Sequence, residues 1–116
     1  MNVHQMICHV SDSLRIALGE IPVATKAPFM GRTLLRLVVI HTGVKPPPGR
    51  AKGPPEAFTT KPGKWDADLA ACHQLIERVA AAERLEPHPF FGNLNIDEWG
   101  RLSWKHLDHH LRQFGA

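Results

Sequence analysis

The feature of the sequence that most constrains the fold is a proline- and glycine-rich stretch over residues 43–63. Proline has no backbone N–H to donate and holds its φ angle nearly fixed, so regular hydrogen-bonded structure cannot run through this stretch. We expect an extended strap that crosses one end of a helical bundle, and we favour this over a ligand for a polyproline-binding domain. The prolines and glycines that define the strap are Gly43, Pro46, Pro47, Pro48, Gly49, Gly53, Pro54, Pro55, Pro62 and Gly63.

The segments on either side of the strap have the periodicity of amphipathic helices. Residues 2–18 and 65–85 both repeat apolar side chains every three or four positions. Asn2 and Gln5 have the spacing of a capping box at the start of the first of these helices. The apolar run over residues 28–42 favours a short buried helix over a strand, because no partner strand is apparent.

A final helix is expected from Asn95 to Phe114. Asn95 and Glu98 again have the spacing of a capping box, and a glycine follows the last apolar position. The sequence therefore predicts an all-α fold, a single domain over residues 1–116, in which an up-and-down helical bundle carries one long Pro/Gly-rich crossover strap.

The composition is that of an ordinary globular protein. Hydrophobic residues make up 43% of the chain, enough to bury a core, yet no apolar run approaches the ~20 residues that a membrane-spanning helix needs. No signal peptide is apparent, so we expect a cytoplasmic location and no membrane partner. Cys8 and Cys72 are too few for a disulfide framework and are expected to stay reduced.

The positive charge of the chain is concentrated in and beside the strap. The formal net charge is +3, of which residues 45–64 carry +4, so the remainder of the chain is slightly acidic. These cations lie in a loop rather than along a helix face, and Phe58 is the only aromatic residue among them. A groove for single-stranded nucleic acid is therefore not indicated. We favour a solvated basic loop and rank nucleic-acid binding last.

The residues that carry chemistry are a pair of histidines in the final helix, His106 and His110. Side chains at i and i+4 project from one helical face, so both imidazoles can reach one cation. A helical projection of residues 2–18 places His9 on the inward-facing half of the first helix. Three imidazoles from two helices predict a site with an open coordination position, which is typical of a catalytic metal rather than of a closed structural zinc site.

The projection also sorts the other residues of the final helix. His109 is expected on the water face, together with Glu98 and Lys105. The apolar arc that is expected to face the core, with Trp99 beside it, contains Ile96, Trp104, Leu107, Leu111 and Phe114.

Two polar residues are candidates to orient the imidazoles. Asp12 lies one turn along from His9 and is also a candidate base, and Gln113 lies beside His110. The remaining histidines are interpreted as packing or turn residues, and these are His4, His41, His73 and His88.

Two segments of the chain resemble the DinB/YfiT-like superfamily of metal-binding helical bundles. They are Met6-Ile7-Cys8-His9-Val10-Ser11-Asp12-Ser13 and His106-Leu107-Asp108-His109-His110-Leu111-Arg112-Gln113. The closer resemblance is to a branch of that superfamily known as a domain of unknown function. The motifs of this branch stand here at His88-Pro89-Phe90-Phe91-Gly92, Glu98-Trp99-Gly100 and the segment from Lys105 to Gly115. The resemblance covers nearly the entire chain and is most specific in its C-terminal third.

The resemblance implies a four-helix bundle that binds a metal through one histidine of an early helix and two of a late one. Carried over, these are His9, His106 and His110, the same three that the projection selects. Relatives in the superfamily include metal-dependent transferases that use low-molecular-weight thiols. Members also begin with a helix before the first metal histidine. Because this sequence starts immediately before that element, we expect a bundle wall to be lacking unless the true start lies upstream. If the wall is lacking, residues 28–42 and a second subunit must cover the exposed apolar surface, which predicts a homodimer.

Two functional hypotheses follow from these observations. In the first, the three histidines hold a divalent cation, Zn²⁺ or Ni²⁺, that activates a thiol or water in a transferase or hydrolase reaction on a small molecule. In the second, the chain is a non-catalytic binding or scaffold module with a vestigial metal site.

Overall fold

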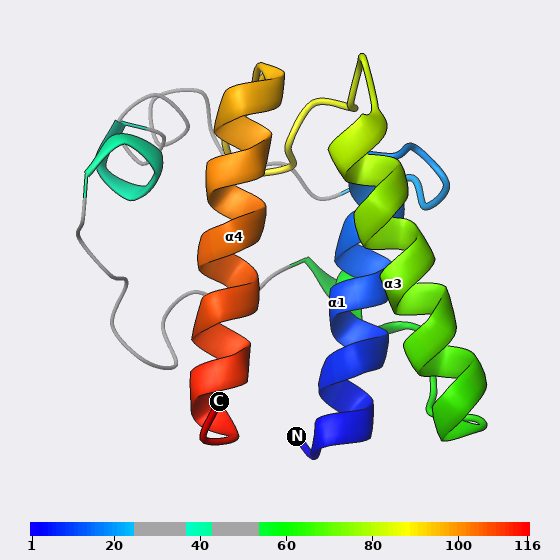
Figure 1. Cartoon of the computed structure of the whole chain (residues 1–116). Helices are drawn as coiled ribbons and strands as arrows, with labels where there is room; N and C mark the ends of the chain where they lie inside the picture. The colour runs from blue at the N-terminus through cyan, green and yellow to red at the C-terminus, as the bar shows by residue number, and fades with distance from the viewer. Residues whose placement is uncertain (25–36, 43–53) are drawn as a thin grey trace.

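The structure is a computed structural model of the chain, and it describes residues 1–24, 37–42 and 54–116. Its named elements are α1 (Val3–Ala17), the one-turn 3₁₀ helix η1 (Pro55–Phe58), α3 (Trp65–Ala81) and α4 (Ile96–Gln113) (Figure 1). Residues 37–41 form a further short helical segment, and no strand occurs in the described part of the chain. The predicted all-α class is therefore confirmed.

The first helix, α1, begins and ends on local signals that the sequence carries. Asn2 and Gln5 form the predicted capping box, in which each side-chain oxygen accepts a hydrogen bond of 2.8 Å from the backbone N–H of the other residue. The helix stops before Gly19, whose φ of 81° lies in the left-handed region that favours glycine. Helix α1 therefore matches the predicted range to within a residue at each end.

The last helix, α4, is bounded in the same way. Asn95 and Glu98 form the second predicted capping box, and the chain leaves the helix through Gly115, whose φ is 82°. Glu98 also lies 3.0 Å from the Nε2 atom of His41, so the start of α4 is joined to the short segment at residues 37–42. The predicted boundaries of this helix are confirmed.

Helix α3 is shorter than its periodicity predicts, because it ends at Ala81 rather than near residue 85. Ala82 has an extended conformation, and the chain turns so that the N–H of Glu86 donates a 2.8 Å hydrogen bond to the carbonyl of Ala17 at the end of α1. Leu85 also packs against the core. A tertiary contact thus replaces the last turn of the helix.

The core lies between α1 and α3, which run in the same direction side by side, whereas α4 runs in the opposite direction (Figure 1). The first turns of α1 and α3 meet where the Nε2 atom of His4 lies 2.6 Å from the Oδ2 atom of Asp68. Leu107 of α4 also packs against this core. The buried residues of the core are Met6, Val10, Leu14, Cys72, Leu75 and Val79. Burying such apolar side chains contributes about 25 cal/mol for each Å² removed from water.

The face that α4 turns inward differs from the predicted arc. Glu98, which the projection places on the water face, is only 2% exposed, whereas Trp104 is 64% exposed. Trp99 is buried and donates a 3.1 Å hydrogen bond to the carbonyl of Glu86. The inward direction is therefore set by Trp99 and the histidines. The exposed members of the predicted arc are Ile96, Trp104, Leu111 and Phe114.

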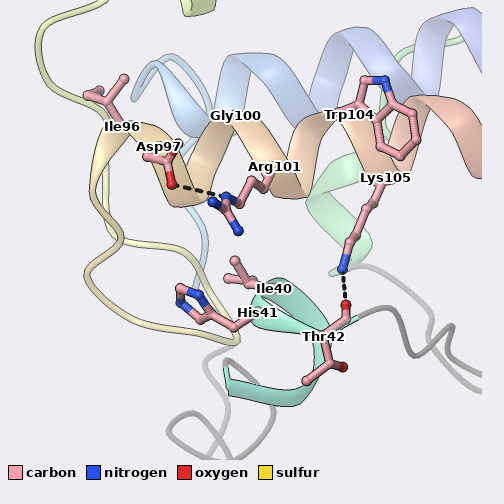
Figure 2. A pocket seen from close by; sticks show the side chains of 9 residues that line it. All are labelled: Ile40, His41, Thr42, Ile96, Asp97, Gly100, Arg101, Trp104 and Lys105. Atoms are coloured by element: carbon pink, nitrogen blue, oxygen red, sulfur yellow. Dashed lines mark hydrogen bonds and ion pairs between the residues drawn. The ribbon is translucent and has the colours of Figure 1, made fainter.

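The strap is described only in its second half, because residues 43–53 lie outside the described residues. The described half contains η1, which packs against α1. Of the predicted helix over residues 28–42, only residues 37–42 are described. Lys105 of α4 donates a hydrogen bond to the carbonyl of Thr42 at the end of that segment (Figure 2). It also donates to the carbonyl of Val39.

None of the helices in the described ranges is both long enough and apolar enough to cross a membrane.

Candidate metal centre

His9 lies in α1 and is held from two sides by the segment around η1. Its Nδ1 atom lies 2.8 Å from the carbonyl oxygen of Ala57, and its ring stacks on Phe58 with the ring centroids 4.2 Å apart and the planes 7° from parallel. Because a carbonyl oxygen can only accept a hydrogen bond, Nδ1 carries the proton of the neutral ring. The Nε2 atom of His9 therefore presents a lone pair.

Helix α4 contributes His106 and His110, which lie one turn apart with their ring centroids separated by 4.6 Å. The Nδ1 atom of His110 lies 3.0 Å from the Oε1 atom of Gln113. Since the amide oxygen accepts, Nδ1 of His110 also carries the proton and Nε2 presents a lone pair. Gln113 thus occupies a position from which it orients the His110 ring.

The Nε2 atoms of the three histidines converge between α1 and α4. The Nε2 atom of His106 lies 3.0 Å from that of His9 and 3.0 Å from that of His110. A neutral His106 can place at most one proton on Nε2, so hydrogen bonding alone leaves one of the two facing lone pairs without a donor. Two nitrogens bound to one tetrahedral Zn²⁺ lie about 3.3 Å apart, close to the observed spacing. The donor set therefore fits a divalent cation.

The surroundings keep the three rings neutral, which is the form that binds metal. Burial, followed by the neighbouring rings of His110 and His9, lowers the pKa of His106 to about 3. Burial also lowers the pKa of His9, although its hydrogen bond to Ala57 acts in the opposite direction. The pKa of His110 is lowered for the same reason, against the hydrogen bond to Gln113. At neutral pH all three lone pairs are available.

Asp12 is fully buried and fastens the segment that holds His9. Its carboxylate accepts hydrogen bonds from the backbone N–H groups of Thr59 at 3.1 Å and Thr60 at 2.8 Å, and it pairs with Arg15 at 3.0 Å. The hydroxyl of Thr60 donates a further hydrogen bond of 2.5 Å. These contacts support an orienting role for Asp12 through the loop backbone, and its role as a base stays a prediction.

Of the other histidines, His73, His109, His88 and His41 lie outside any cluster of metal-ligating side chains in the described part of the chain. His73 and His109 are exposed, and exposure of His109 agrees with the helical projection. His88 forms part of a turn, as expected, because its Nδ1 atom accepts hydrogen bonds from the N–H groups of Phe90 at 3.0 Å and Phe91 at 3.2 Å. His41 pairs with the carboxylate of the capping box of α4.

Sequence reasoning misses a second cluster of side chains that can ligate metal, formed by His4, Cys8 and Asp68. One signal for it is present in the sequence, since His4 and Cys8 have the same i, i+4 spacing as the pair in α4. The periodicity accounts for Asp68 only as an acidic residue in the first turn of α3. The packing of α1 against α3 is what brings Asp68 to the other two.

A pocket of about 380 Å³ adjoins the three-histidine cluster, because His9 lines both. Its volume lies within the range of small-molecule sites. Phe58 supplies an aromatic surface and Lys61 a cation. The remaining lining residues are Met1, Gln5, Thr60 and Pro62.

A larger pocket of about 660 Å³ lies between α4 and residues 37–42, and none of the three histidines lines it (Figure 2). Its wall includes the exposed ring of Trp104 and the ion pair between Arg101 and Asp97, 3.0 Å apart.

The sequence model of one protein family, described as "Protein of unknown function (DUF1569)", matches residues 2–116. No curated protein and no solved structure matches the chain.

Proposed function

The chain belongs to this family of unknown function, and we propose that it is a metal-dependent protein of the DinB-like kind in which His9, His106 and His110 hold a divalent cation. The observation that carries the proposal is the convergence of three Nε2 atoms with two of the ring protons fixed on the far side, by Ala57 and Gln113. When neutral imidazoles face one another in this way, a cation accepts the lone pairs of their Nε2 atoms.

The residues leave room for a reaction at the cation. When bound, Zn²⁺ or Ni²⁺ supplies Lewis acidity that lowers the pKa of a water or thiol ligand. Three protein ligands hold the cation, and the stacking of Phe58 on His9 keeps one of the three rings in place. Because the superfamily that the chain resembles includes metal-dependent transferases that use low-molecular-weight thiols, we propose a transferase of this kind, with hydrolysis by water as the variant reaction.

The adjoining pocket supports a small anionic substrate or cosubstrate. Lys61 contributes a positive charge to the surface of a pocket that His9 also lines. Attraction of a carboxylate-bearing thiol to such a surface raises its local concentration. Phe58 offers an apolar surface to the rest of the molecule.

The proposal is tested by the metal content of three proteins: the wild type, His106→Ala and His109→Ala. Each is stripped with a chelator, reloaded with Zn²⁺, dialysed and measured by elemental analysis. We expect His106→Ala to retain one equivalent less than the wild type, and His109→Ala, which removes an exposed histidine of the same helix, to match the wild type. Equal metal in all three proteins would refute the three-histidine site.

Turnover separates an enzyme from a binding module. The Zn²⁺-loaded chain is given cysteine as a minimal thiol together with a nitro-activated aryl halide, and loss of free thiol is followed. Consumption that depends on Zn²⁺ and is lost in His106→Ala supports the transferase. Metal binding without consumption of thiol, and without hydrolysis of an activated ester, supports the non-catalytic module.

A further inference from the structure

A second group of metal-ligating side chains lies where α1 and α3 both begin, at the end of the molecule that carries the N-terminus (Figure 1). The Nε2 atom of His4 lies 2.6 Å from the Oδ2 atom of Asp68, and the Sγ atom of Cys8 lies 3.9 Å from the same oxygen. One ligand atom from each of the three residues lies within 4.8 Å of the other two.

This cluster is separate from the three-histidine site. Cys8 and His9 are neighbours in α1, so their side chains leave the helix about 100° apart. His4 and Cys8 contact Asp68 of α3, whereas His9 contacts His106 of α4. Helix α1 therefore presents one set of ligands to each of the helices beside it.

We propose that His4, Cys8 and Asp68 bind a second divalent cation, of the borderline-soft class to which Zn²⁺ belongs. Imidazole nitrogen, thiolate sulfur and carboxylate oxygen are the ligand atoms that Zn²⁺ takes in proteins. On one tetrahedral Zn²⁺, a nitrogen and an oxygen lie about 3.4 Å apart, and a sulfur and an oxygen about 3.6 Å apart. The observed separations differ from these by less than about 1 Å, which small side-chain rotations absorb.

Charge and access both suit a cation. Burial and the nearby Asp68 carboxylate raise the pKa of the Cys8 thiol, so a cation would bind with release of the thiol proton to solvent. The resulting thiolate and the Asp68 carboxylate would then cancel the two charges of the cation. Cys8 is only 2% exposed, whereas the side chains of His4 and Asp68 are 22% and 25% exposed. A cation thus enters from the solvent side, with the sulfur at the bottom of the site and a further coordination position open towards water.

A bound cation would tie the two helix starts to the end of the strap. The same Oδ2 atom of Asp68 accepts a 2.8 Å hydrogen bond from the N–H of Gly63. The competing explanation is that His4, Cys8 and Gly63 simply satisfy this carboxylate by hydrogen bonding, and the experiment has to separate the two.

Cobalt(II) is the probe that separates them, because a cobalt–thiolate bond adds a charge-transfer absorption that nitrogen ligands do not give. The three-histidine site contains no sulfur, so this absorption reports the second site alone. We compare the wild type with Cys8→Ser and with Cys72→Ser, a matched control that alters the other buried cysteine. We expect the charge-transfer absorption in the wild type and in Cys72→Ser. In Cys8→Ser we expect the absorption to be absent and the protein to bind one equivalent of Co²⁺ less than the wild type.

The result does not depend on the proposed function. His106→Ala, which damages only the first site, should keep the thiolate absorption. No such absorption in the wild type at saturating Co²⁺, or the same absorption in Cys8→Ser, would overturn the proposal.

Two further variants guard against a folding defect in Cys8→Ser. His4→Ala and Asp68→Asn change partly exposed side chains, and circular dichroism verifies that their helices are intact. We expect each to weaken Co²⁺ binding at this site by more than the roughly 10–100-fold that loss of an outer hydrogen-bond partner causes. Unchanged affinity in both folded variants would establish the cluster as hydrogen-bonded only.

Discussion

At the residue scale, the role of a histidine in this chain is decided by its Nδ1 atom. In His9 and His110 that atom donates to an oxygen, so the Nε2 lone pair is free to face a cation. In His88 the same atom accepts hydrogen bonds from Phe90 and Phe91, so the proton lies on Nε2 and the ring is a packing residue. One residue type serves two purposes because the hydrogen-bond partners of its Nδ1 atom differ.

His88 should make stability depend on pH. Burial lowers its pKa from 6.5 to about 4, so between these values the unfolded chain binds more protons than the folded one. Stability should fall as pH falls through this window, by on the order of 2 kcal/mol between pH 7 and pH 5.

The variant His88→Asn isolates this contribution, because Asn keeps an acceptor oxygen for the turn but does not titrate. We expect urea unfolding at pH 7, 6 and 5 to show a shallower pH dependence in the variant, whatever its stability at pH 7. The other buried histidines are the same in both proteins. Parallel pH profiles would show that His88 does not carry the effect.

Loss of the Asp12 carboxylate should lower both the stability of the fold and the affinity for Zn²⁺. Asp12→Ala leaves the N–H groups of Thr59 and Thr60 without their acceptor, which we expect to cost about 3 kcal/mol. Because the loop that holds His9 loosens, Zn²⁺ affinity should fall roughly 10–100-fold. Urea unfolding and Zn²⁺ competition measure the two effects, and Asp66→Ala, an exposed carboxylate in α3, is the control that should alter neither.

At the scale of the elements, helix ends and helix interiors use glycine for different reasons. Gly19 ends α1 with a φ of 81°, and a Cβ atom added there would lie 3.0 Å from the side chain of Glu86. Gly100 lies inside α4, is exposed, and has no atom within 4 Å of an added Cβ. The first glycine is required by the backbone, whereas the second only weakens a helix.

Replacing these two glycines with alanine should therefore change the free energy of unfolding in opposite directions. Gly19→Ala should destabilise the protein by about 1–2 kcal/mol, since alanine is strained at a positive φ. Gly100→Ala should stabilise it by about 0.5–1 kcal/mol through helix propensity. The thermal midpoints of both variants are compared with that of the wild type. Midpoints that shift in the same direction would contradict the different roles given to the two glycines.

At the scale of the whole molecule, the three helices are not joined equally. Helices α1 and α3 share the apolar core, whereas α4 reaches α1 mainly through its long side chains, with Leu107 at the core and the histidine cluster beside it. The candidate metal site therefore also joins α4 to the rest of the fold.

Zn²⁺ should stabilise the molecule through this joint. At a free concentration 100 times the dissociation constant, one site adds about 2.7 kcal/mol. We expect a higher thermal midpoint and slower amide hydrogen exchange in α4 when Zn²⁺ is added, and His106→Ala should lose the effect on α4. Unchanged exchange in α4 of the wild type would argue that the cation does not bridge the helices. Sedimentation of the same samples tests the predicted homodimer.

The helix ends were predictable because they depend on neighbouring residues. Asn2, Gln5, Asn95 and Glu98 sit three positions apart in each pair, and the spacing is sufficient to form both caps. The inward face of α4 was not predictable in this way. Projection ranks side chains by hydrophobicity, whereas the buried position of Glu98 depends on His41, far away in the sequence.

The features of the candidate site likewise include some that neighbouring residues fix and some that depend on contacts between distant segments. The helical class, the helix ends and the i, i+4 pair of His106 and His110 could be predicted from the sequence, since all of these follow from chemistry within a few residues. Helical projection and the family resemblance both predicted His9 as the partner of this pair, and the packing of α1 beside α4 brings their Nε2 atoms together. Nothing in the sequence pointed to the contacts by which Asp12 fastens the loop behind His9, or to Asp68 in a second cluster. Contacts between distant segments depend on how whole helices pack, and no local spacing records that packing.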